Sequence, residues 1–239
     1  MRVVSIVIGV LLITVAPTTG QPIRNSKRAE IFVLATLHQF HADSNYYSFE
    51  KLSQIIKDVD PDIICVELTA ADIKSRRKQG TKVEYEKSVF PLVDKYGYRV
   101  VPLEPDEPKF SQLVGLNVES EKDLRTNEPA RAAAFALYTE TLYKHLFSTW
   151  TSPLDVNSAV TDSHFEVKHN YQNAIYGEKQ QKVWEGWNRH FLDQIITTAR
   201  SSSGRRVLVL VGVEHAFWIR KELRGERTVK LREAASFLK

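Results

Sequence analysis

Continuous apolar runs alternate with amphipathic stretches along most of the chain, and this alternation predicts the order of its elements. Four runs have the length and composition of buried strands: Ile31–Leu37, Asp62–Leu68, Tyr98–Pro105 and Val207–Val211. Because the apolar residues in these runs are consecutive rather than at every second position, we expect both faces of the sheet to be covered. Strands joined through helices with short connections are typical of right-handed crossovers on a parallel sheet.

Apolar residues recur at helical spacing between these runs. The pattern covers Ser48–Val59, with Ser48 placed to cap. A polar helix-like stretch follows in Ala70–Gln79, and Val83–Gly97 is another helix-like segment. Two longer helices are expected over Ala130–Trp150 and Glu178–Arg200, both before the last central strand. The sequence therefore predicts the α/β class. We expect a mostly parallel central sheet flanked by helices, with a helical insertion at about residues 110–204. Thr228–Ala234 is expected to add an edge strand.

The composition is that of an ordinary globular domain. The chain has 239 residues, of which 43% are hydrophobic and 26% charged, so residues 21–239 fit a single domain with a full core. Its net charge is +4, and Lys74–Gln79 is the only dense basic cluster in the sequence. A nucleic-acid partner is therefore not expected, since such proteins concentrate Lys and Arg on one face.

The N-terminus has the pattern of a secretory signal peptide. Arg2 precedes the apolar run Val3–Ala16, and small residues follow before Gln21. We expect residues 1–20 to be removed and the mature chain to be secreted or periplasmic, with no transmembrane helix. The run is short for a membrane span, although an uncleaved anchor is the alternative.

The single cysteine, Cys65, lies inside an apolar run. One cysteine excludes an intramolecular disulfide, and an apolar environment raises the pKa of a thiol. We therefore interpret Cys65 as a core residue rather than a nucleophile.

Ionisable side chains follow each apolar run at the point where the predicted strand ends. In open parallel sheets, ligands bind beyond the carboxyl ends of the strands, so these groups are expected to converge. Imidazole and carboxylate together suit a divalent transition metal, or general acid–base chemistry near neutral pH. The residues concerned are His38, His41, Glu67, Glu104, Glu214 and His215.

Three of these strand ends resemble the motifs of the TraB/GumN group, which includes the Tiki metalloproteases, within the erythromycin esterase-like/ChaN-like fold. "FVLATLH" is similar to a strand ending in Gly-Thr-x-His, "PDIICVEL" to Pro-Asp-x-x-x-x-Glu, and "VLVLVGVEH" to Gly-x-x-His. "WNRHFLDQI" resembles the family helix that precedes the last strand, and its Asn188 fits that pattern. Ala35 replaces the usual glycine of the first motif and Trp187 the usual arginine of the helix. Arg189 is about 200° further round that helix.

The resemblance implies an exported hydrolase acting on a small-molecule or peptide substrate. In the Tiki-like case, His38, Glu67 and His215 would bind a divalent metal of the Mn, Co or Zn type, and Glu214 or Glu104 would relay protons. His41, Glu104, Asn188 and Arg189 would support the site or bind substrate.

Two further kinds of protein remain open on the same resemblance. In a metal-free esterase-like enzyme, His38 would be the general base, oriented by Glu67, and His215 would polarise the substrate. A haem-binding protein would use Tyr46, Tyr47 or an exposed histidine as axial ligand. The departures at Ala35 and Trp187 also leave open a catalytically degenerate protein that acts through protein contacts.

Overall fold

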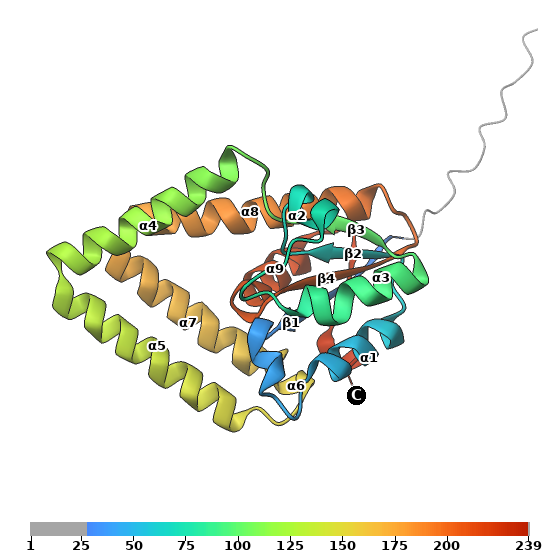
Figure 1. The fold of residues 1–239 in the computed structure, drawn as a ribbon, viewed down its shortest axis with the longest axis horizontal. Coiled ribbons are helices and arrows are strands. Elements are labelled where there is room, and N and C mark those ends of the chain that lie inside the picture. Colours follow the sequence, from blue (N-terminus) through green and yellow to red (C-terminus); the bar gives the residue numbers. More distant parts are fainter. Residues whose placement is uncertain (1–27, 239) are drawn as a thin grey trace, which may run out of the picture.

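A computed structural model describes residues 28–238 and contains a five-stranded sheet in which every pairing is parallel. The strand order is β3-β2-β4-β1-β5 (Figure 1). The α/β class, the parallel sheet and the edge strand are as the sequence predicts. The strands are β1 Glu30–Thr36, β2 Ile63–Val66, β3 Arg99–Pro102, β4 Arg206–Gly212 and β5 Lys230–Arg232.

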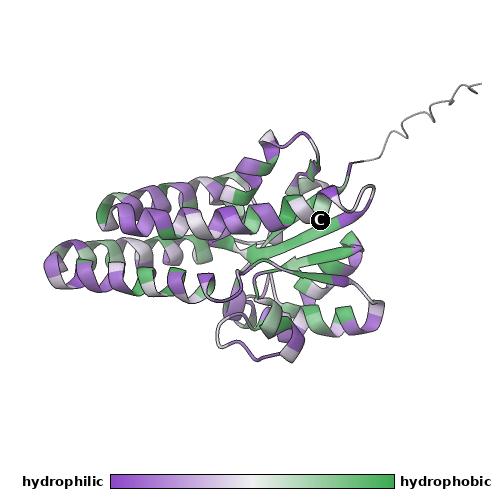
Figure 2. Cartoon of the chain, turned by 90° about the horizontal axis from the view of Figure 1, so that it is seen from above, coloured by the Kyte–Doolittle hydropathy of each residue, from purple (hydrophilic) through white to green (hydrophobic). Residues whose placement is uncertain are grey.

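Helices lie on both sides of the sheet (Figure 2), and the central strands are accordingly buried on both faces. The short helix η1 follows β1, and α1 follows the Ser48 cap, whose side chain accepts a hydrogen bond from the amide of Lys51. The helical segments before β3 are η1 His38–Ala42, α1 Phe49–Val59, α2 Ala70–Ser75, η2 Tyr85–Val89 and α3 Phe90–Tyr96.

The helical insertion extends away from the sheet (Figure 1), and in it α4 packs along α8 while α5 packs along α7. The sequence predicts α5 and α8 but not α4, and it indicates no element where α6 and most of α7 lie. After the insertion, α9 starts immediately beyond β4. The bounds are α4 Lys109–Asn127, α5 Pro129–Thr149, α6 Pro153–Val156, α7 Ala159–Tyr176, α8 Glu178–Arg200, α9 Val213–Gly225 and η3 Ala234–Ser236.

A buried arginine joins the insertion to the sheet. Arg220 of α9 is 3% exposed and donates to both carboxylate oxygens of Asp162 on α7, at 2.9 and 2.5 Å. Its Nη1 also donates to the carbonyl of Val33 at 3.3 Å and to Asn157 Oδ1 at 3.2 Å. Asn157 Oδ1 in turn accepts from the amide of Ala35 at 2.7 Å. The network therefore connects α9, α7 and the residue after α6 to β1.

Cys65 lies in the middle of β2, opposite Val101 on one side and Val209 on the other, and is fully buried. Burial raises the pKa of its thiol to about 12, in keeping with a packing role. Across residues 28–238, no helix is both long and apolar enough to span a membrane. The predicted signal peptide, residues 1–20, lies outside the described residues.

Candidate active site

The carboxyl ends of β1, β4 and β2 meet at one edge of the sheet. Thr36 is in register with Gly212, and Val66 with Leu210, so the residues that follow these strands come together. The amide of Gly212 donates to Glu67 Oε2 at 2.7 Å. A cavity of about 260 Å³ at this edge is lined by Thr36, Leu37, His38, Phe40, Tyr143, Phe147 and Gly212–His215.

His38 has an unusual backbone conformation. Its φ of 51° lies in the left-handed region, which costs a non-glycine residue about 1–3 kcal/mol and recurs at functional sites. His41, one of the predicted supporting residues, holds the chain beside it. Its Nε2 accepts from the amide of Leu37 at 3.0 Å, and its Nδ1 donates to the carbonyl of Tyr47 at 2.6 Å. Burial lowers the pKa of His41, so this imidazole is neutral and its tautomer is set by the two bonds.

Glu84, which the sequence did not indicate, orients His38. Glu84 Oε1 is 2.7 Å from His38 Nδ1 and accepts from Thr36 Oγ1 at 3.0 Å. Glu84 is fully buried, and its Oε2 has no hydrogen-bond partner among the described residues. Burial opposes the charge on His38, but the carboxylate of Glu84 outweighs it and the pKa of His38 is raised. The expectation that Glu67 orients His38 is therefore corrected: Glu84 bonds to the imidazole.

Glu67 is paired instead with Lys82, a second residue without a sequence signal. Lys82 Nζ lies 3.1 Å from Glu67 Oε1, donates to the Glu67 carbonyl at 3.0 Å, and donates to Glu104 Oε1 at 2.5 Å. Burial alone would raise the pKa of Glu67, but Lys82 and the imidazoles of His215 and His38 lower it to about 2. The pKa of Glu104 is raised, chiefly by burial. Glu104 thus belongs to the site through Lys82.

His215 stands in the first turn of α9, where Asn188 sets its tautomer. His215 Nδ1 is 3.0 Å from Asn188 Oδ1, and Asn188 Nδ2 donates to the carbonyl of Trp184 at 2.8 Å. Because the amide nitrogen of Asn188 donates to Trp184, the amide oxygen is the atom that faces His215. This oxygen can only accept, so Nδ1 of His215 carries the proton and donates it. Burial lowers the pKa of His215, so its Nε2 carries a lone pair at neutral pH. The predicted residue Asn188 therefore fixes the orientation of His215.

Two side chains of the insertion, Lys168 and Tyr143, donate hydrogen bonds to Glu214, and a third, His169, lies beside it. Lys168 Nζ donates to its Oε2 at 2.7 Å, His169 Nε2 lies 3.1 Å from the same oxygen, and the Tyr143 hydroxyl donates to Oε1. Burial opposes ionisation, yet Lys168 and His169 hold the pKa of Glu214 well below its ordinary value. A carboxylate saturated in this way is a fixed anion, which argues against the proton relay expected from the sequence.

The remaining predicted residues lie elsewhere or are already bonded. Arg189 is exposed, with its guanidinium 3.8 Å from Glu222 and 5.3 Å from the centre of the Trp218 ring. It is therefore not part of the bonded network around His215, and the supporting role expected for it is not seen. Tyr47 is fully buried and donates its hydroxyl to the carbonyl of Ala35 at 2.8 Å, so it offers no free ligand to haem.

The side chains do not fit the predicted metal centre as they are arranged. Within residues 28–238, no group of three or more His, Cys, Asp or Glu side chains is placed to hold a metal ion. Glu67 uses one oxygen for the Gly212 amide and the other for the Lys82 ammonium, a cation that would repel a metal ion. His38 and His215 line the cavity and bond through Nδ1 to Glu84 and Asn188, which leaves two Nε2 nitrogens rather than three ligands.

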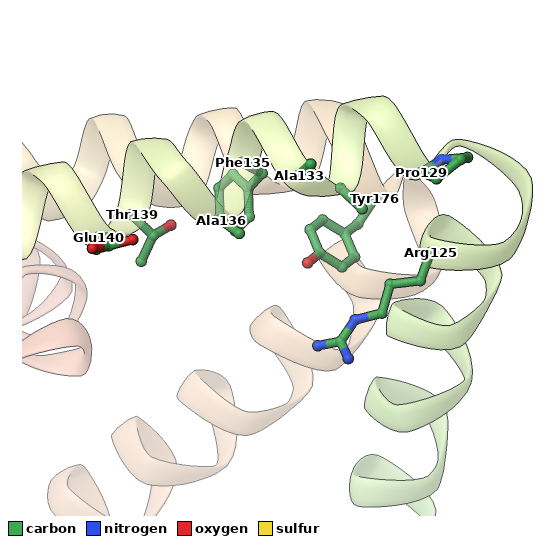
Figure 3. Close-up of a pocket in the computed structure, with 9 residues that line it drawn as sticks. Arg125, Pro129, Ala133, Phe135, Ala136, Thr139, Glu140 and Tyr176 are labelled. Carbon is green, nitrogen blue, oxygen red and sulfur yellow. The ribbon is translucent and has the colours of Figure 1, made fainter.

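A separate hollow of about 650 Å³ lies in the insertion, between α4 and α5 (Figure 3). Its walls are mainly the alanines and Phe135 of α5, with Arg125 of α4 and Tyr176 at the end of α7. No histidine lines it, and it includes none of the strand-end residues.

Comparisons with protein-family models, curated proteins and solved structures find no match to this chain.

Proposed function

We propose that this chain is a metal-independent hydrolase of the esterase kind, in which His38 acts as general base on a water molecule. The single observation that carries the proposal is the pairing of His38 Nδ1 with the buried Glu84, which leaves Nε2 at the cavity. A carboxylate behind an imidazole fixes the productive tautomer and stabilises the imidazolium that forms during proton transfer. A buried carboxylate oxygen without a partner is costly, and such groups are retained at catalytic sites.

The reaction follows from the two imidazoles. His38 Nε2 removes a proton from water as the oxygen bonds to the carbonyl carbon, and returns it to the leaving oxygen as the carbon–oxygen bond breaks. His215 presents a lone pair at Nε2, so it accepts a hydrogen bond from the same water and orients it. Polarisation of the substrate by His215, as the resemblance implies, would require an N–H at Nε2. The ring proton is instead on Nδ1, which donates to Asn188 Oδ1.

The oxyanion would be stabilised by the start of α9. No side chain caps this helix. Gly212 to His215 line the cavity, so the first backbone amides of the helix lie at the cavity wall. Unpaired amides at a helix N-terminus, together with the helix dipole, favour a developing negative charge. Lys82 does not stabilise the oxyanion, because its ammonium group is already paired with the carboxylates of Glu67 and Glu104.

The test is hydrolysis of 4-nitrophenyl acetate by purified protein and by two variants. Asparagine tolerates a left-handed backbone, so His38→Asn should fold normally, and it should lower kcat/KM by about 10²–10⁴-fold. Glu84→Gln keeps the shape of the side chain but removes its charge, which lowers the pKa of His38. We expect a lower maximum rate and an acidic limb of the pH profile displaced to lower pH. A fully active His38→Asn variant would refute the proposal.

Elemental analysis of the same preparation tests the metal hypothesis derived from the resemblance. The proposed mechanism requires that hydrolysis persist in metal-free protein treated with EDTA. Stoichiometric Mn, Co or Zn, lost together with activity in His215→Ala, would favour the metallopeptidase instead. A peptide panel should accompany the ester, since the two mechanisms need not share a substrate.

We also propose that the protein is exported. The mass of the exported protein should correspond to a chain starting near Gln21, and an intact Met1 would indicate the uncleaved anchor.

A further inference from the structure

An aromatic groove continues outward from the cavity that contains His38. Phe40, Tyr143 and Phe147 line that cavity and also line an adjoining hollow of about 810 Å³, together with Glu140, Lys144 and Ser148. The two spaces therefore share one aromatic wall, made by η1 on one side and α5 on the other. A ligand lying along this wall would reach from the open end of the groove to His38.

The rings on this wall are only partly covered by the protein itself. Phe40 is 44% exposed, and its ring centre is 5.3 Å from that of Phe147. Phe147 stacks on Tyr143 with 6.2 Å between ring centres. Phe40 is two residues after His38 in the same short helix, η1, so the exposed aromatic ring lies on the same element as the proposed base. Exposed apolar surface beside a pocket is typical of ligand-binding sites.

The polar groups of the groove are already paired. Lys144 Nζ donates to Glu140 Oε1 at 2.6 Å, so the two charges at the rim compensate one another. The Tyr143 hydroxyl donates to Glu214, which leaves the face of its ring rather than its oxygen to the groove. The ionisable residues that line the hollow therefore offer no uncompensated charge to an anionic or cationic ligand, and the groove favours a neutral apolar one.

We propose that this groove binds the apolar acyl chain of a neutral ester substrate, with the ester carbonyl at His38. This inference rests on the proposed hydrolase function and names its substrate class. Burial of one methylene group is worth about 0.8 kcal/mol, which corresponds to about fourfold in kcat/KM. Because the groove is open on one side, we expect roughly two- to fourfold per methylene until the chain fills it.

The test compares 4-nitrophenyl acetate, butyrate, hexanoate and octanoate. kcat/KM should rise along the series in the wild type, and Phe40→Ala and Phe147→Ala should each reduce the gain per methylene. Leu137→Ala is the matched control, because Leu137 is on α5 and 65% exposed but does not line the groove. Its gain per methylene should equal that of the wild type.

Binding of 4-nitrophenyl alkyl ethers, which cannot be hydrolysed, separates the two proposals. Calorimetry with the wild type and with His38→Asn should show tighter binding of longer ethers, weakened in Phe40→Ala. Hydrolysis that depends on His38 but not on chain length, with no ether binding, would overturn the groove alone. Ether binding without hydrolysis of any ester would overturn the hydrolase and leave the apolar groove standing.

Discussion

Gly212 lies close to the Nε2 side of the His38 imidazole. A Cβ atom at residue 212 would be 2.6 Å from His38 Nε2 and 3.5 Å from Glu67 Oε2. The backbone of Gly212 is ordinary, so glycine is required here by close approach rather than by conformation. We expect Gly212→Ala to displace the ring of His38 from Glu84 and to lower ester hydrolysis at least 100-fold, the scale of a lost general base.

Stability should change little in this variant, because a side-chain ring can swing away more easily than backbone can move. The control is Gly80→Ala, where an added Cβ meets no atom within 4 Å. Activity and thermal melts of both variants provide the measurement. Full activity in Gly212→Ala would mean that His38 does not act from the position seen here.

Residues such as Glu84 and Lys82 explain why the site could be predicted only in part. His38, Glu67 and His215 are found because they terminate apolar runs, and parallel strands bring their ends together. Glu84 and Lys82 reach the site from the segment before η2, where no strand ends. That Glu84 is buried, as Tyr85 and Ser88 are, is seen only in the structure. A carboxylate on the buried face of a helical pattern requires a partner.

At the scale of elements, the fold follows from strand composition, whereas the attachment of the insertion depends on contacts distant in sequence. The continuous apolar runs identify β1 to β4, and helical spacing identifies α1, α5 and α8. The helix α4 is not predicted, because few of its residues are buried and its apolar residues do not form one stripe. The hydrogen-bonded residues that join α7 and α9 to β1 are polar, so the periodicity of hydrophobic residues does not predict these contacts.

The contact between Arg220 and Asp162 should therefore be a main determinant of how the insertion is held. Arg220→Met preserves the length and the apolar stem of the side chain but leaves the carboxylate of Asp162 without its donor, and it removes one donor from the Val33 carbonyl and from Asn157 Oδ1. Removing one partner of a buried ion pair costs about 3–5 kcal/mol, and we expect a loss of that order in the free energy of unfolding. Denaturant titration measures it.

Lys221 supplies the matched control for this prediction. It is the next residue of α9 and pairs with Glu166 of α7 at 2.6 Å, but the pair is on the surface. Exposed ion pairs contribute little, so Lys221→Met should unfold close to the wild-type midpoint. Equal effects of the two substitutions would show that burial of the Arg220 network is not what holds α7 and α9 together.

In the whole molecule, the sheet and the insertion meet at Glu214 and His215, and buried histidines at this junction couple stability to pH. His169 of α7 stacks on Trp184 of α8, with 3.6 Å between ring centres, and contacts Glu214 of α9. Burial, which outweighs the nearby carboxylate, lowers the pKa of His169 from 6.5 to about 4. The folded state therefore resists a proton that the unfolded chain accepts.

The sign of the effect follows from these two pKa values. Above pH 6.5 His169 is neutral in both states, and as pH falls toward 4 only the unfolded chain is protonated, so stability is lost. Between pH 7 and pH 5 this histidine alone should remove roughly 2 kcal/mol. His38 acts in the opposite direction, because its raised pKa stabilises the folded state at low pH and that contribution is lost as pH rises. The wild-type profile contains both effects, so the His169 contribution must be obtained by difference.

His169→Phe isolates it. Phenylalanine can keep the stacking on Trp184 and cannot titrate, so the variant should lose less stability than the wild type between pH 7 and pH 5. Guanidinium unfolding at several pH values measures the slopes, and the difference in stability at pH 8 accounts for the packing change, because His169 is neutral there in both states. A lower starting stability of the variant does not affect the test. If both proteins show the same slope between pH 7 and pH 5, His169 is not the group that links the folding of the insertion to pH.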